Sequence, residues 1–294
     1  MTTAPFFDRL EAARVERGTC LCVGIDPRLE RMPASLVDRA GGNVETLLYE
    51  FGLGVLDAAA EHAACFKPQI AFFEAHGIPG LRAYARVVAE ARGRGLLVIG
   101  DIKRGDIGST AEAYAKAHLT PGAEFEVDCA TINPYLGADS LGPFVDAAVA
   151  HGKGLFVLVR TSNPGAADLQ ERDMEGRPLF ERTGALVAGL GEPHKSPVTG
   201  LHPVGAVVGA TSPAAGAALR AALPDVPFLV PGYGAQGAGA ADVVPNFRAD
   251  GSGAVVNASR SINYPEVTDG DWLAAVARAA QAAKEDLRGA LVAS

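Results

Sequence analysis

Short apolar runs recur eight times along the chain, separated by longer polar or mixed stretches. The runs cover residues 20–25, 65–70, 96–102, 127–132, 155–159, 204–208, 228–230 and 253–256. Each is short enough for a buried strand, whereas stretches between them, such as 79–92 and 111–118, carry apolar residues at helical spacing. This alternation is typical of βα units, in which the strands form a parallel sheet.

Eight such units in a chain of 294 residues predict an α/β fold of the (β/α)₈ type, a TIM barrel. A doubly wound open sheet is the alternative, because strand–helix alternation fits both architectures. Residues 5–17 form a predicted helix before the first strand, and we expect it to cap the opposite end of the barrel. The longest connection, 163–203, contains a predicted helix at 179–190. About 40 residues rarely make an independent core, so we expect one barrel domain over residues 1–294.

The distribution of polar residues favours the barrel over the open sheet. Eight residues that suit ligand binding lie in or just after predicted strands: Asp26, Lys67, Asp101, Lys103, Ser162, Gly232, Gly234 and Arg260. In a barrel the carboxyl ends of the strands converge on one face, where active sites are built. In an open sheet the same ends spread too widely to share one small ligand.

Composition and charge argue against some classes of binding partner. Apolar residues make up 48% of the chain, enough for a large core, and the net charge of −8 argues against a nucleic-acid partner. The start of the chain lacks a basic, apolar leader, and no apolar run approaches membrane-spanning length. We therefore expect a cytoplasmic protein with no membrane partner. The four cysteines are expected to be buried and reduced, and no histidines pair at metal-ligand spacing, so no metal site is predicted.

The segment DIKRGDIGST at 101–110 concentrates charge at the end of an apolar strand. Strand alternation points Asp101 and Lys103 the same way, and Asp106 follows where the strand ends. Buried charges are costly unless they are paired, so the cluster needs a reason. A salt-bridge network that fixes the barrel rim is one interpretation, and a catalytic cluster is the other.

A glycine-rich segment, GYGAQG at 232–237, matches the pattern GxGxxG. That pattern marks a dinucleotide site when it follows the first strand of a sheet, but here it follows the seventh predicted strand. In barrels the loops after strands seven and eight commonly bind phosphate. Backbone amides at Gly232 and Gly234, the amide of Gln236 and the guanidinium of Arg260 are the expected phosphate ligands. A simple surface arginine is the alternative for Arg260.

The pattern Asp-x-Lys-x-x-Asp-Ile-Gly-x-Thr resembles the signature of the orotidine 5′-phosphate decarboxylase family. FKPQIAFFE at 66–74, RTSNPG at 160–165, VPGYGAQG at 230–237 and NASRSI at 257–262 resemble further segments of that family, in the same order. Together they are similar to the longer-chain bacterial subgroup, type 2. The resemblance implies a homodimeric barrel that converts orotidine 5′-phosphate (OMP) to UMP and CO₂ without a cofactor, in de novo pyrimidine synthesis.

The resemblance also implies roles for charged residues. Lys67, Asp101, Lys103 and Asp106 would form an alternating array around the reacting carbon. Lys103 would donate the proton, Asp101 would lie close to the substrate carboxylate and hold Lys103, and Lys67 would bridge Asp101 and the sugar. Asp106 would reach the site of the neighbouring subunit.

Three further residues gain a role from the resemblance. Ser162 would bond the pyrimidine ring, and Asp26 would bind a ribose hydroxyl. Thr110 would lie with Asp106 at the partner's ribose. Without the resemblance, Asp26 is equally well a turn residue before Pro27, and Thr110 is simply a residue at a helix start.

Two rival functions remain open at this point. A sugar-phosphate decarboxylase or lyase of the same barrel superfamily shares the Asp-x-Lys-x-x-Asp pattern but uses a divalent metal. A metal site would more naturally place a carboxylate where this chain has Lys67. A catalytically silent nucleotide-binding barrel would keep the glycine loop and Arg260 but would not require Lys103.

Overall fold

The computed structural model describes residues 4–234, 237–267 and 271–293. It contains an eight-stranded parallel sheet whose strands follow the order β2-β1-β8-β7-β6-β5-β4-β3. The strands are β1 (Leu21–Ile25), β2 (Cys65–Pro68), β3 (Ile99–Arg104), β4 (Cys129–Ile132), β5 (Gly154–Arg160), β6 (Val204–Val208), β7 (Phe228–Val230) and β8 (Ala254–Ala258). Each strand overlaps one of the eight predicted runs, and β3, β5 and β8 extend beyond theirs.

The two ends of this sheet also meet. Parallel bridges join Phe66 to Val98 and Gln69 to Asp101, which connects β2 to β3. The amide of Phe66 donates to the carbonyl of Leu97 at 2.9 Å. The sheet therefore closes into a (β/α)₈ barrel, which confirms the predicted fold and rules out the open doubly wound sheet.

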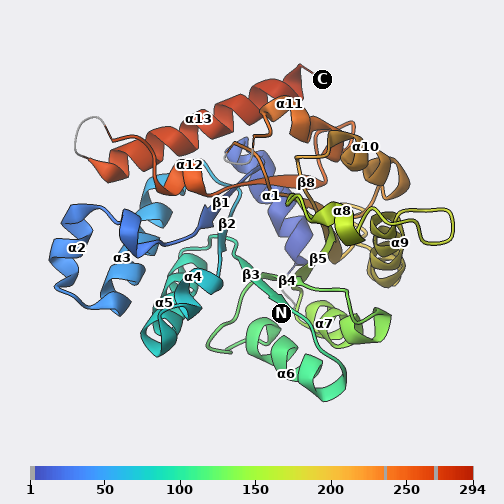
Figure 1. Ribbon diagram of the computed structural model, residues 1–294, viewed down its shortest axis with the longest axis horizontal. Coiled ribbons are helices and arrows are strands. Elements are labelled where there is room, and N and C mark those ends of the chain that lie inside the picture. Colours follow the sequence, from blue (N-terminus) through green and yellow to red (C-terminus); the bar gives the residue numbers. More distant parts are fainter. Residues whose placement is uncertain (1–3, 235–236, 268–270, 294) are drawn as a thin grey trace.

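Helices surround the strands (Figure 1). They are α1 (Phe6–Arg17), α2 (Ala34–Ala40), α3 (Val44–Ala59), α4 (Ala71–Glu74), α5 (Gly77–Gly93), α6 (Gly108–Leu119), α7 (Ala138–Ala150), α8 (Ala166–Leu169), α9 (Leu179–Gly191), α10 (Pro213–Ala222), α11 (Ala240–Val243), α12 (Arg260–Asn263) and α13 (Trp272–Val292). Short 3₁₀ helices cover Leu29–Arg31, Glu192–His194 and Val244–Asn246. None of the described helices is long and apolar enough to cross a membrane.

The first helix closes the amino-terminal end of the barrel, as predicted. Phe6, Phe7 and Leu10 of α1 are buried in a core cluster with side chains from inside the barrel, among them Phe156. Arg9 on the same helix pairs with Asp128 at 3.1 Å. A second, larger core cluster lies between strands and outer helices. Because α1 covers this end, we look for a ligand site at the carboxyl ends of the strands, where barrels carry their active sites.

The connection from β5 to β6 holds the short helix α8 and the longer α9, which starts where the predicted helix at 179–190 starts and ends one residue later. Phe180 and Val187 of α9 are buried in the outer core. Arg160 at the end of β5 forms an ion pair with Glu171, 2.5 Å away. The connection is thus packed and tied to the strand end that carries Ser162. All four cysteines are free and buried, as expected.

Candidate active site

A cavity of about 490 Å³ opens at the carboxyl ends of the strands. All eight strands, or the residues that directly follow them, contribute to its lining. Lys67, Asp101 and Lys103 gather on one side of the cavity and Arg260 lies on the other. Leu158, Val207 and Leu229 form part of its apolar floor. The size and the mixture of apolar walls with a few polar groups suit a small organic ligand.

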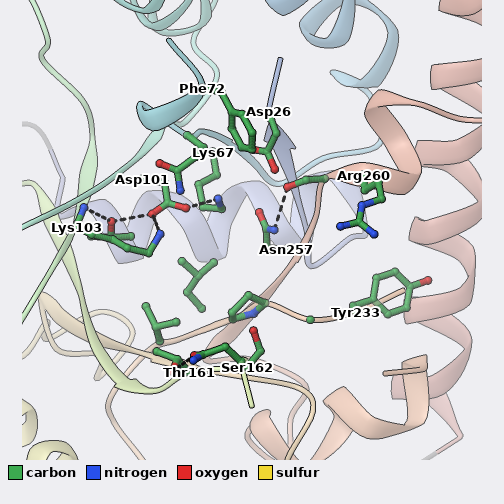
Figure 2. A pocket seen from close by; sticks show the side chains of 18 of the residues that line it. Asp26, Lys67, Phe72, Asp101, Lys103, Thr161, Ser162, Tyr233, Asn257 and Arg260 are labelled. Carbon is green, nitrogen blue, oxygen red and sulfur yellow. Dashed lines mark hydrogen bonds and ion pairs between the residues drawn. The ribbon is translucent and has the colours of Figure 1, made fainter. Parts of the chain in front are cut away.

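The carboxylate of Asp101 is held between two lysines (Figure 2). The Nζ atom of Lys67 lies 2.6 Å from Oδ2, and the Nζ atom of Lys103 lies 2.5 Å from Oδ1. The Asp101 and Lys67 side chains are almost closed off from solvent, whereas that of Lys103 is 45% exposed. Lys103 therefore faces the cavity and Lys67 forms its buried support. The predicted contact between Asp101 and Lys103 is present. It does not arise from simple strand alternation, because Lys103 has a φ of 46° and not an extended backbone.

Both partners of the buried pair are charged. Burial by itself would raise the pKa of Asp101, but the ammonium groups of Lys67 and Lys103 outweigh it and hold that pKa well below its usual range. Burial likewise opposes the charge on Lys67, yet the carboxylates of Asp101 and Asp26 raise the pKa of this lysine. The site consequently presents fixed charges of alternating sign at neutral pH.

Asp26 lies at the end of β1, on the other side of Lys67 from Asp101 (Figure 2). Its backbone is anchored, because its amide donates to Oδ1 of Asn263 at 2.8 Å and its carbonyl accepts from the hydroxyl of Tyr264 at 3.0 Å. The Oδ1 atom is buried and has no hydrogen-bond partner within the described residues. Burial raises the pKa of this carboxyl, although Lys67 and Ser259 counteract part of the effect. Asp26 thus offers an acceptor oxygen to a ligand.

The opposite side of the cavity carries Gly232, Tyr233 and Arg260. Figure 2 shows Arg260 and Tyr233 on the side away from Lys103. Gly232 adopts φ 108° and Gly234 φ 72°, conformations that favour glycine. Gly234 is not part of the lining, and its amide donates to the carbonyl of Ala238 at 2.8 Å. Gln236 lies outside the described residues.

Ser162 lines the cavity next to Thr161, just beyond β5 (Figure 2). Its carbonyl accepts a hydrogen bond from the hydroxyl of Thr211, 3.2 Å away. This bond holds the main chain at Ser162, a residue of the cavity wall. The structure therefore brings seven predicted site residues together around one cavity: Asp26, Lys67, Asp101, Lys103, Ser162, Gly232 and Arg260.

Two predicted residues, Asp106 and Thr110, do not line this cavity. Oδ1 of Asp106 accepts the amide of Ile107 at 2.8 Å, at the start of α6. Thr110 is exposed in the first turn of the same helix. Within one chain these residues are separate from the charged array.

Several lining residues were missed in the sequence, notably Thr131, Asn257 and Phe72. Thr131 and Asn257 each carry a polar side chain in the apolar strands β4 and β8, and this could have drawn attention to them. Phe72 gives no such signal, because an aromatic residue beside a strand is usually part of the core. Its position at the cavity depends on the short helix α4.

The arrangement of charged groups suits a catalytic site better than a salt-bridge network that only fixes the barrel rim. One ammonium is open to the cavity, its carboxylate partner is pinned by a second ammonium, and an arginine lies on the far side. The profile of the Orotidine 5'-phosphate decarboxylase / HUMPS family matches residues 19–266. The chain belongs to this family. It is an enzyme, a carboxy-lyase like its named relatives.

The sequence similarity to named proteins extends over almost the whole chain. The orotidine 5'-phosphate decarboxylase of Rhodopirellula baltica is 41% identical over 97% of this chain and 99% of its own. The orotidine 5'-phosphate decarboxylase of Deinococcus radiodurans is 43% identical over 98% of this chain and 99% of its own. The solved structure of Leishmania donovani OMP decarboxylase aligns with a TM-score of 0.79 at 34% identity, covering 99% of this chain and all of that one.

Proposed function

We propose that this enzyme decarboxylates OMP to UMP and CO₂, with Lys103 as the proton donor. The observation that carries the proposal is the Asp101 carboxylate bound on both oxygens by Lys67 and Lys103, at the edge of a cavity with Arg260 on its far side. The family membership and the similarity to named orotidine 5'-phosphate decarboxylases support it.

The chemistry explains why such an array is needed. When the bond from C6 of the pyrimidine to the carboxylate breaks, CO₂ leaves and the electron pair stays on C6 in the plane of the ring. The ring π system cannot delocalise a pair in that plane. The ammonium of Lys103 stabilises the developing charge and then transfers a proton to C6, which gives UMP. The neutral amine regains a proton from solvent.

Asp101 and Lys67 keep Lys103 ready for this step. Oδ1 of Asp101 orients the ammonium, and the position of Asp101 also brings negative charge close to the substrate carboxylate. Lys67 balances Asp101 and lies toward Asp26, the proposed ligand of a ribose hydroxyl. Ser162 would bond the pyrimidine ring.

Groups far from C6 must supply much of the binding energy. Enzymes lower barriers by about 8–23 kcal/mol, more than one lysine provides. Arg260, Gly232 and Gln236 are the proposed phosphate ligands, and their binding energy positions the pyrimidine against Lys103. The predicted role of Gly234 is not kept, because its amide is already bonded to the carbonyl of Ala238.

We propose that the active form is a homodimer in which Asp106 and Thr110 act at the neighbouring site. Neither residue lines the cavity of its own chain. Large apolar side chains are exposed on the loops after β3 and β4, namely Ile107, Tyr135 and Leu136. A second copy would bury this surface and would place Asp106 at the other cavity.

The remaining proposals concern the whole chain. We propose that residues 1–294 act as a single barrel domain with the longer connection at 163–203. We also propose cytoplasmic pyrimidine synthesis as its setting, with no cofactor, nucleic acid or membrane partner.

Ultraviolet absorbance tests the proposed reaction directly. Purified protein is mixed with OMP in the presence of EDTA, and conversion to UMP is expected at full rate. EDTA is included because a metal-dependent sugar-phosphate decarboxylase would lose activity. Absence of conversion by folded protein would disprove the proposal, and sugar phosphates with added divalent metal would be the next substrates.

A further inference from the structure

The strand that carries Lys103 is irregular next to β4. Gly100 pairs with Ala130, but the next pair is Arg104 with Ile132. The chain advances four residues on β3 for two on β4, so β3 bulges between these pairs. Bulges of this kind re-aim side chains next to active sites.

Lys103 lies inside the bulge with a left-handed backbone. Its φ is 46°, and Glu175 is the other non-glycine residue with positive φ in the described part of the chain. A residue with a Cβ atom in this region is strained, and such strain persists only where the surroundings hold it in place. The proposed proton donor therefore needs a specific anchor for its main chain.

The hydroxyl of Thr131 provides three bonds at this point. It accepts the amide of Ile102 at 3.0 Å and the amide of Lys103 at 3.0 Å. It also lies 3.0 Å from Oδ1 of Asp101, to which it donates its proton. One donor and two acceptor positions are all that a hydroxyl has, so this group is fully used.

The three bonds fix the positions of Lys103 and Asp101 relative to each other. Two bonds fix the main chain at the base of the Lys103 side chain, and the third fixes the carboxylate oxygen that binds its ammonium. Thr131 is 1% exposed on β4, between Ala130 and Ile132. Valine would fill nearly the same volume and keep the strand preference, but it would leave two amides without this acceptor.

We infer that Thr131 is a positioning residue for decarboxylation, which holds the bulge at Lys103 and the carboxylate of Asp101 in one geometry through its hydroxyl. The inference rests on the proposed function, in which Lys103 protonates C6. Thr131 acts on the reaction through Lys103 and Asp101.

The test compares Thr131→Val, which removes the hydroxyl, with Thr131→Ser, which keeps it. Thr19→Val is the matched control, because Thr19 is also buried and its hydroxyl accepts the amide of Leu21 at 3.1 Å, before the first strand and away from the cavity. Steady-state kinetics with OMP, UMP affinity and hydrogen–deuterium exchange over residues 99–106 are measured for each.

We expect kcat of Thr131→Val to fall about a hundredfold, the size of effect that a misplaced reacting group produces. KM and the affinity for UMP should change by less than about threefold, since less than 1 kcal/mol of uniform binding is involved. Exchange at 99–106 should accelerate. Thr131→Ser should keep kcat within about threefold of the parent, and Thr19→Val should leave kcat unchanged.

Wild-type kcat in Thr131→Val would overturn the inference. Equal loss in the Val and Ser variants would also overturn it, because the methyl group would then matter more than the hydroxyl. If Thr131→Val does not fold, Thr131→Cys replaces it, since a thiol is a weak acceptor, and must show the same loss. Failure of the parent protein to convert OMP would instead disprove the proposed function. In that case the exchange data alone decide whether the hydroxyl anchors the bulge, and unchanged exchange would overturn the inference.

Discussion

The Nζ atom of Lys67 lies 2.6 Å from Oδ2 of Asp101, and the two side chains are only 6% and 8% exposed. A buried ion pair tolerates the loss of neither partner, because the remaining charge stays in a poorly solvated place. This pair also lies beneath the proposed proton donor. Stability and catalysis are therefore linked at Asp101.

Lys67→Met should destabilise the protein by roughly 3 kcal/mol at neutral pH, since the charge of the buried Asp101 is then balanced by the partly exposed Lys103 without the help of Lys67. The depressed pKa of Asp101 adds stability above the unfolded pKa of about 3.9, and this is lost as pH falls through the lower folded pKa. The variant has a higher folded pKa, so its Asp101 contributes less. Urea unfolding at roughly pH 3 to pH 7, a range that includes the unfolded pKa, measures the free energy of unfolding of both proteins. The free energy of the parent should fall more steeply toward low pH than that of the variant.

The control is Arg39→Met, which breaks an exposed pair with Glu50 and should cost less than about 1 kcal/mol. Equal effects of the two substitutions would contradict the role of burial at Lys67.

Lys103→Ala should lower kcat by at least about 10³-fold, because it removes both the proton donor and the charge that stabilises the carbanion. Folding and UMP binding should be retained, since Lys67 still balances Asp101. Stopped assays with OMP and calorimetric titration with UMP measure the two properties. Lys116→Ala, a change to an exposed lysine on α6, is the control. Loss of folding in Lys103→Ala would favour the rim salt-bridge interpretation.

A mixed dimer of Lys103→Ala and Asp106→Ala subunits should be active although each variant alone is not. If Asp106 crosses the interface, both substitutions fall in one site of the mixed dimer and the other site is intact. Differently tagged subunits, refolded together and purified through both tags, supply the sample. An inactive mixed dimer would place Asp106 in its own chain's chemistry.

Arg260→Ala should reduce kcat/KM for OMP about a hundredfold, because charge-assisted bonds to phosphate contribute a few kcal/mol at most. The same variant should match the parent on orotidine, the substrate without phosphate. Arg82→Ala, at an exposed position on α5, is the matched control and should not alter either rate. A parallel loss on both substrates would assign Arg260 to the ring or the array instead.

The residues at the strand ends show how far sequence could reach. Lys67, Asp101 and Lys103 lie in or just after apolar runs, and the sequence predicts that they meet because parallel strands in a barrel converge at their carboxyl ends. The structure contains the predicted contact between Asp101 and Lys103. The backbone between them was not foreseen, because a bulge depends on how β3 pairs with β4, and this pairing cannot be read from β3 alone.

Thr131 is the clearest example of a site residue that the sequence does not predict. It lies 30 residues from Asp101 in sequence but shares a hydrogen bond with it. In the sequence it is one polar residue in a four-residue strand, with nothing to connect it to the charged segment.

The amino-acid sequence by itself determined the number and order of the strands, the positions of helices such as α1 and α9, the burial of the strands and the types of group at their ends. These follow from local periodicity and from the cost of burying polar side chains. Only the tertiary structure decided the closure of β2 onto β3, the bulge at Lys103 and the three bonds of Thr131. Those features arise from contacts between residues far apart in the chain, and their geometry depends on strand register, which no local pattern specifies.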